Sequence, residues 1–136
     1  MIPILGAAAV VVQTGSVLLV QRRNEPDAGL WGYPGGKVDA GETVRAAAAR
    51  ELHEETGVIA TPGRILENLD LIGNFPKGQA GYHFHLVLVE CHYQSGNPQA
   101  ADDALDARWV SLNDVQSGTL AMSDNVPQVL EKALKS

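Results

Sequence analysis

Three glutamates near the middle of the chain, Glu51, Glu54 and Glu55, are the residues whose types and spacing point most directly to chemistry. In a helix, positions i, i+3 and i+4 fall on one strip of surface, so the three carboxylates would lie together. Like charges one turn apart cost about 0.2–0.5 kcal/mol, and acids near the C-terminal end of a helix oppose its dipole. Carboxylate oxygens clustered in this way suit Mg²⁺ or Mn²⁺, which would make the arrangement favourable. An ordinary solvated acidic face is the alternative interpretation.

A helix must position these carboxylates, and the sequence around them predicts one. Residues 46–49 are all alanine, Thr43 can cap the start, and Gly57 stands where the helix should end. Arg50 precedes Glu54 by four residues and could orient it or partly neutralise it.

The stretch from residue 36 to residue 58, GKVDAGETVRAAAARELHEETGV, resembles the Nudix box, G-x5-E-x7-R-E-U-x-E-E-x-G-U, in which U is a bulky apolar residue. Every defined position matches without a gap or a substitution: Gly36, Glu42, Arg50, Glu51, Leu52, Glu54, Glu55, Gly57 and Val58. The resemblance implies a Mg²⁺- or Mn²⁺-dependent pyrophosphohydrolase in which Glu51, Glu54 and Glu55 hold the metal. It implies structural roles for Gly36, Glu42, Arg50 and Gly57, and for Glu42 a capping box with Asp39 is the competing explanation.

Five residues outside the box have roles that the resemblance implies. Gly35, just before the box, would offer its main-chain carbonyl to the metal, and Arg23 would face the substrate phosphates. Asp103, in the loop before Trp109, would bind metal or take a proton from water, as would Glu54. Tyr33 could stack on a nucleobase, and Asn125 could contact an oxidised guanine as in enzymes of the MutT kind. The competing interpretations are a surface position for Arg23, a solvated acidic loop for Asp103, a core position for Tyr33 and a helix cap for Asn125.

Length, composition and charge limit the class of protein. A chain of 136 residues with 45% apolar residues predicts a single domain spanning residues 1–136. A net charge of −6 without a Lys/Arg run argues against a nucleic-acid polymer as partner. The single Cys91 favours a reducing compartment, the cytoplasm, and the apolar N-terminal segment is too short to span a membrane.

The resemblance implies an α/β class, the Nudix fold, which is an α/β/α sandwich with a central mixed β-sheet. Hydrophobic patterning predicts a hairpin from residues 6–13 and 17–20, a turn at 61–63, strands at 64–72 and 82–93 joined by a loop at 73–81, and a short strand at 107–110. Ser111 should cap a short helix, and Asp124 or Asn125 the last one. Sheet edges could support a homodimer.

The expected substrate is a small nucleotide. The segments GLWGYPGGKVDAGET and GNPQAADDALDARWV are similar to those of small Nudix proteins described as ADP-ribose pyrophosphatases, which release AMP and ribose 5-phosphate. A MutT-like nucleoside triphosphate or 8-oxo-dGTP pyrophosphatase is the alternative, supported by Arg23, Tyr33 and Asn125. Two minor alternatives are a non-catalytic nucleotide-binding module and an isopentenyl diphosphate isomerase.

Overall fold

The computed structural model describes residues 2–74 and 81–135, which form a series of strands and helices. In chain order they are β1 (Ile4–Val10), β2 (Val12–Gln13), β3 (Ser16–Arg22), β4 (Trp31–Gly32), β5 (Gly35–Lys37), α1 (Val44–Thr56), β6 (Ile59–Asn74), β7 (Gly81–Ser95), β8 (Ala104–Ser111), α2 (Leu112–Gln116) and α3 (Val126–Leu134).

The strands form two sheets. The first has the order β5-β1-β7-β6, in which β1 runs parallel to β7 while the outer pairs are antiparallel. The second contains β2, β3 and β4, with β8 paired antiparallel to β3. The mixed sheet is therefore confirmed, and the second sheet lies beyond what the sequence patterning predicted.

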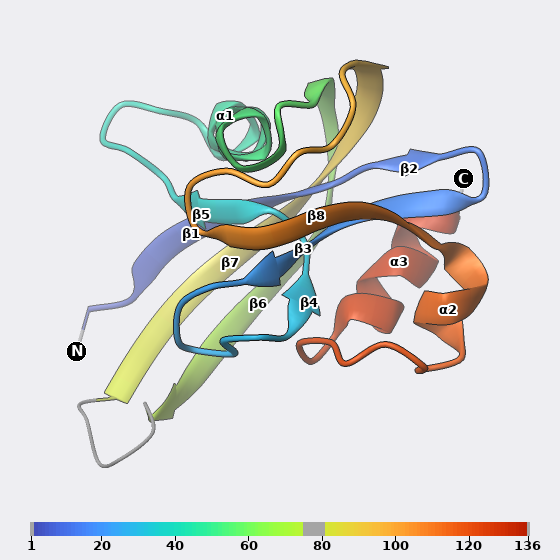
Figure 1. Cartoon of the computed structure of the whole chain (residues 1–136). Helices are drawn as coiled ribbons and strands as arrows, with labels where there is room; N and C mark the ends of the chain where they lie inside the picture. The colour runs from blue at the N-terminus through green and yellow to red at the C-terminus, as the bar shows by residue number, and fades with distance from the viewer. Residues whose placement is uncertain (1, 75–80, 136) are drawn as a thin grey trace.

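Helices cover opposite sides of the strands (Figure 1). Helix α1 packs on one side through Ala47, Ala48 and Leu52, against a core that includes Val89 and Cys91. On the other side α2 and α3 contribute to a second core that includes Leu19 and Leu88. The α/β/α arrangement is confirmed, because each layer buries the apolar stripe of its helix against the sheets.

The alternation along β7 explains how one strand serves both cores. Leu86 and Leu88 face the core with α3, while Val87, Val89 and Cys91 face the core with α1. Successive side chains of a strand point to opposite faces, so a run buried on both sides reads as continuously apolar.

The predicted N-terminal hairpin is only partly correct. Val12 and Gln13 pair with Val17 and Ser16, but β1 leaves this sheet and pairs in parallel with β7. Small side chains at Ala7 and Ala9 let α1 pack closely over β1, which favours the non-local partner.

The predicted turn at residues 61–63 is wrong, because those residues lie within β6. The pairing with β7 shifts register between Pro62 and Ile65, so a bulge accommodates the Pro-Gly pair. Strand β6 is the edge of its sheet, where proline is tolerated. Of the predicted loop at 73–81, residues 75–80 lie outside the described residues, while Gly73, Asn74 and Gly81 belong to strands.

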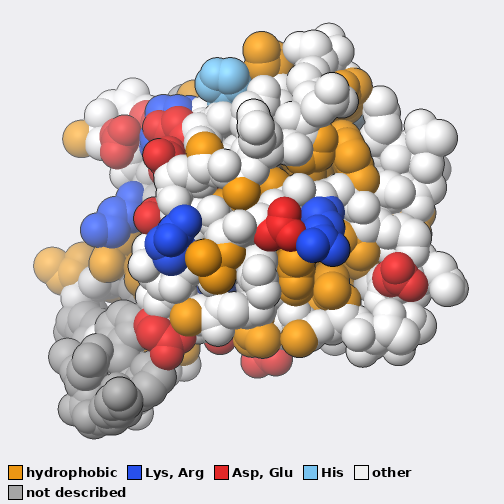
Figure 2. All heavy atoms as spheres, viewed as in Figure 1, with side chains coloured by type: hydrophobic (Ala, Val, Ile, Leu, Met, Phe, Trp, Pro, Cys, Tyr) orange, Lys and Arg blue, Asp and Glu red, His pale blue; other side chains and the backbone are white. Residues whose placement is uncertain are grey.

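Charged side chains of both signs are scattered over one face of the molecule (Figure 2). On the face seen in Figure 2, Lys and Arg side chains are dispersed among acidic, apolar and uncharged ones and form no continuous basic patch. Among the described residues, no helix has the length and apolar character needed to cross a membrane.

Candidate functional site

A cavity of about 640 Å³ opens beside the first sheet. Its floor includes Gly6, Ala8 and Leu86 of β1 and β7, and its walls come from the start of β5, from the loop after β3 and from the residues before α3. The predicted site residues that line it are Arg23, Tyr33, Gly35, Gly36, Glu51, Glu55, Asp103 and Asn125. The fold therefore brings together residues spread over most of the sequence.

Helix α1 carries the acidic residues, and its caps follow the sequence prediction. The Thr43 hydroxyl accepts a hydrogen bond from the Ala46 N–H (3.0 Å), and Gly57 ends the helix with φ 77° while its N–H donates to the His53 carbonyl. Leu52, Glu55 and Thr56 lie on the buried stripe of this helix. Glu55 is consequently turned inward, towards β5 and the cavity.

Glu55 is the most unusual group in the site. It is 6% exposed, and among the described residues its Oε2 atom is buried without a hydrogen-bond partner. Burial, followed by the hydrogen bond to the Glu51 carboxyl, raises the pKa of Glu55 to about 9, although the Gly35 backbone and the Arg22 charge oppose the shift. A buried carboxyl group in this state needs either a proton or a cation beside it.

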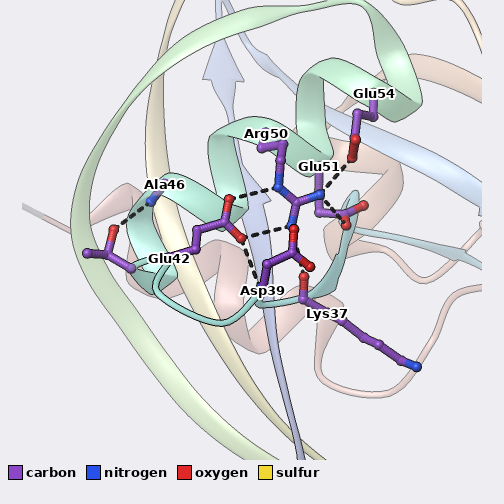
Figure 3. Close-up of polar contacts among 8 residues, drawn as sticks. Lys37, Asp39, Glu42, Ala46, Arg50, Glu51 and Glu54 are labelled. Carbon is purple, nitrogen blue, oxygen red and sulfur yellow. Dashed lines mark hydrogen bonds and ion pairs between the residues drawn. The ribbon is translucent and has the colours of Figure 1, made fainter.

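Arg50 organises the remaining acids (Figure 3). Its Nη1 atom donates to Glu51 (3.0 Å) and to Glu54 (2.7 Å), and its Nε and Nη2 atoms donate to the two Glu42 carboxylate oxygens. Its guanidinium holds the pKa of Glu42 at about 2. Glu42 Oε1 also accepts the Asp39 N–H, so Glu42 braces the loop before α1, whereas Thr43 is the helix cap. Glu54 does not line the cavity within the described structure.

Two glycines let the β5 backbone lie close to the Glu51 carboxyl and to the neighbouring strand β1. A Cβ atom at Gly36 would lie 2.6 Å from the Glu51 carboxyl carbon. A Cβ atom at Gly35 would lie 2.4 Å from the Ala7 carbonyl oxygen of the neighbouring strand. Only glycine fits at either position without displacement of its neighbours.

The donor set fits a divalent cation, although the acids are not arranged around one. Within the described residues, no three His, Cys, Asp or Glu side chains are placed to hold a metal ion, and Arg50 ties down Glu51 and Glu54 instead. The unpartnered Glu55 oxygen and the adjoining Glu51 carboxyl nevertheless supply hard oxygen ligands at one place. Gly36 has no side chain to fill the space beside the Glu51 carboxyl. Mg²⁺ and Mn²⁺ prefer such ligands and usually keep several waters.

Asp103 and Arg23 meet at the rim of the cavity. The Arg23 N–H donates to the Asp103 carbonyl (3.0 Å), and Asn24 Nδ2 donates to Asp103 Oδ1 (3.1 Å). The neighbouring Asp102 is not among the described residues that line the cavity, and it has a left-handed backbone with φ 51°.

The aromatic residues and Asn125 differ in part from expectation. Trp31 is a core residue, 8% exposed. Tyr33 lies half-buried, and its hydroxyl donates to the Val126 carbonyl at 2.6 Å. Asn125 precedes α3 with φ 74°, and in the described structure its side chain makes no capping hydrogen bond. A side-chain cap therefore does not explain Asn125.

A comparison with known families decides the assignment. The model of the NUDIX domain matches residues 3–130 of the chain. The chain belongs to the Nudix family.

Two Nudix relatives of this chain are named for different substrates. The chain is 31% identical to the ADP-ribose pyrophosphatase of Methanocaldococcus jannaschii over 113 residues, which are 83% of this chain and 64% of that protein. It is 32% identical to the oxidized purine nucleoside triphosphate hydrolase of Danio rerio over 129 residues, 90% of this chain and 76% of that protein. The chain thus spans slightly less than two thirds of the archaeal relative's length.

A solved Nudix structure has the same fold over nearly the whole chain. The crystal structure of the MutT NUDIX hydrolase from Burkholderia pseudomallei superposes with a TM-score of 0.80 at 30% identity. The match covers 97% of this chain and 98% of that one.

Two of the basic residues that line the cavity in the described structure had no predicted role in this Nudix site. Arg22 lines the cavity, and its charge acts on Glu55, although the sequence argument favoured Arg23. Lys37 also lines it, directly after the first glycine of the box. Its position one residue beyond Gly36 is the signal that could have pointed to it.

Proposed function

We propose that this Nudix protein is a Mg²⁺- or Mn²⁺-dependent hydrolase of a nucleoside diphosphate derivative, with ADP-ribose as the first candidate substrate. The observation that carries the proposal is the buried, unpartnered Oε2 atom of Glu55, beside the Glu51 carboxyl at the cavity wall. A carboxylate in that position is costly unless a cation compensates it. The similarity to the ADP-ribose pyrophosphatase of Methanocaldococcus jannaschii supports the same substrate class.

In the proposed site, Glu51, Glu54, Glu55 and the Gly35 carbonyl would hold the cation, and Arg50 holds Glu51 and Glu54 beside it. When bound, a divalent cation offsets the charge of the diphosphate and favours deprotonation of a water molecule. Arg22, Arg23 and Lys37 place positive charge along the cavity, where they would orient the phosphates. Glu54 or Asp103 accepts the proton from the attacking water at a carboxylate oxygen.

The charge of the cavity favours ADP-ribose over a triphosphate. The basic lining residues are Arg22, Arg23 and Lys37, and the acidic ones are Asp27, Glu51, Glu55, Asp70, Asp103 and Asp124. An acidic lining penalises each additional phosphate on a ligand, and ADP-ribose carries fewer phosphates than a nucleoside triphosphate. The carboxylates away from Glu51 and Glu55 can accept hydrogen bonds from the hydroxyl groups of the terminal ribose.

One observation favours a second candidate, a MutT-like nucleoside triphosphate or 8-oxo-dGTP pyrophosphatase. Asn125 lines the cavity, and its amide is not used for capping in the described structure. An amide offers both donors and an acceptor, which suit the edge of a purine. The similarity to the oxidized purine nucleoside triphosphate hydrolase of Danio rerio supports this candidate.

A hydrolysis panel tests the proposal. The protein is incubated with ADP-ribose, 8-oxo-dGTP, ordinary dNTPs, NADH and dinucleoside polyphosphates, with Mg²⁺ and with EDTA, and the products are separated by chromatography. Release of AMP and ribose 5-phosphate from ADP-ribose, at the highest kcat/KM and only with Mg²⁺, supports the first candidate. Preference for a triphosphate with release of pyrophosphate supports the second, and no metal-dependent cleavage of any compound contradicts the proposal.

A further inference from the structure

A hydrogen bond joins the loop between β4 and β5 to the start of α3. The Tyr33 hydroxyl donates to the Val126 carbonyl at 2.6 Å, and Val126 is the first residue of α3. The bond connects residues 93 positions apart in the sequence, and both residues line the cavity.

The residue before Val126 is held in an unusual conformation. Asn125 has a left-handed backbone with φ 74°, which asparagine tolerates better than most residues. Its carbonyl accepts the Val129 N–H at 3.0 Å, closing the first turn of α3, while its side chain makes no capping bond in the described part of the chain. Both Asn125 and Tyr33 line the cavity.

We propose that Tyr33 is a positioning residue whose hydroxyl fixes the first turn of α3 so that Asn125 meets the part of the substrate away from the phosphates. The inference rests on the proposed function and holds for either candidate substrate. The inference concerns the Tyr33 hydroxyl, which donates to the Val126 carbonyl, and it is separate from the stacking role expected for the Tyr33 ring.

A double-mutant cycle tests whether Tyr33 acts through Asn125. We expect Tyr33→Phe to raise KM for the best panel substrate about two- to tenfold, the effect of one lost hydrogen bond, and to change kcat less than KM. In the Asn125→Ala background the same substitution should raise KM less than about twofold, because the group it positions is gone. Tyr93→Phe is the matched control, since it removes a hydroxyl bond to the Gly96 carbonyl (2.8 Å). Tyr93 lies outside the set of described residues that line the cavity.

Three results would overturn the inference. The first is an unchanged KM in Tyr33→Phe together with a raised KM in Tyr33→Leu, which would assign the role to the ring. The second is an equal rise in KM in both backgrounds. The third is an equal rise in Tyr93→Phe, which would indicate a general effect on stability.

Hydrogen exchange separates this inference from the proposed function. The Val129 amide, which reports the first turn of α3, should exchange faster in Tyr33→Phe than in wild type and remain unchanged in Tyr93→Phe. If the wild type hydrolyses nothing in the panel, the proposed function fails, while faster Val129 exchange in Tyr33→Phe still supports the role of the Tyr33 hydroxyl in fixing α3. Unchanged Val129 exchange in Tyr33→Phe overturns that role even if the enzyme is active.

Discussion

Glu51 and Glu55 stand one helical turn apart on α1, and both line the cavity. Burial and the adjoining Glu51 carboxyl raise the pKa of Glu55 to about 9, which favours a protonated Glu55 carboxyl group near neutral pH. A divalent cation would take the place of that proton and would also reach the buried Oε2 atom of Glu55, which has no hydrogen-bond partner in residues 2–74 and 81–135. Glu51 and Glu55 therefore fit a site that a cation completes.

Substitutions at Glu54 and Asp103 should identify the group that accepts the proton. We predict that Glu54→Gln lowers kcat about 10²–10⁴-fold, as expected for loss of a metal ligand or a general base. Its pairing with Arg50 is partly exposed, so the melting temperature should change little. Asp103→Asn keeps the Oδ1 acceptor for Asn24 and should lower kcat comparably only if Asp103 is the base.

The pH profile of kcat decides between the two acids, since the variant that lacks the base loses the acidic limb. Glu131→Gln, an exposed substitution on α3, is the control. Wild-type turnover in both Glu54→Gln and Asp103→Asn would contradict these roles.

Alanine at the two glycines of β5 should give different defects. At Gly36 the new Cβ meets the flexible Glu51 carboxyl at 2.6 Å, so we predict about 10–100-fold weaker Mn²⁺ binding with little loss of stability. At Gly35 it meets the Ala7 carbonyl at 2.4 Å and the Ala8 backbone, and the free energy of unfolding should fall by about 1–3 kcal/mol. Thermal unfolding and Mn²⁺ titration check both, and wild-type Mn²⁺ affinity in Gly36→Ala would disprove the first.

The Glu42–Arg50 pair should make stability depend on acidic pH. Hydrogen bonds from Arg50 lower the pKa of Glu42 from 4.5 to about 2, so the folded state holds this proton less tightly than the unfolded state. The contribution is present above pH 4.5 and is lost as the pH falls from 4.5 to about 2. Urea denaturation across that window should show a steeper decline for wild type than for Glu42→Gln. Parallel curves would show that the pair contributes nothing.

Local signals made α1 predictable, but they could not rank its three acids. Thr43, Gly57 and the alanines specify the helix through neighbours in sequence. Which glutamate turns inward depends on how Leu52 packs against the sheets, and that packing places Glu55 rather than Glu54 at the cavity. The box predicted the three acids as a group, whereas the separate environment of each acid depends on tertiary packing.

The other differences between the sequence predictions and the structure also arise from contacts between residues far apart in the chain. Strand β1 pairs with β7, which lies far along the chain, and nothing in the first twenty residues specifies that partner. The register of β3 with β8 shifts between Gln21 and Arg22, so simple alternation could not choose between Arg22 and Arg23. The left-handed backbone of Asn125 belongs to a junction that Tyr33 holds from a distant loop.

The central claim is that Glu55 completes a divalent-cation site on which hydrolysis depends. The most direct measurement is a Mn²⁺ titration of wild type and Glu55→Gln, with ADP-ribose cleavage assayed in the same samples. We predict that wild type binds Mn²⁺ and releases AMP only when the cation is present. The folded variant should bind at least about tenfold more weakly and turn over at least about a hundredfold more slowly. Wild-type binding and turnover in Glu55→Gln, or AMP release by wild type in EDTA, would contradict the account.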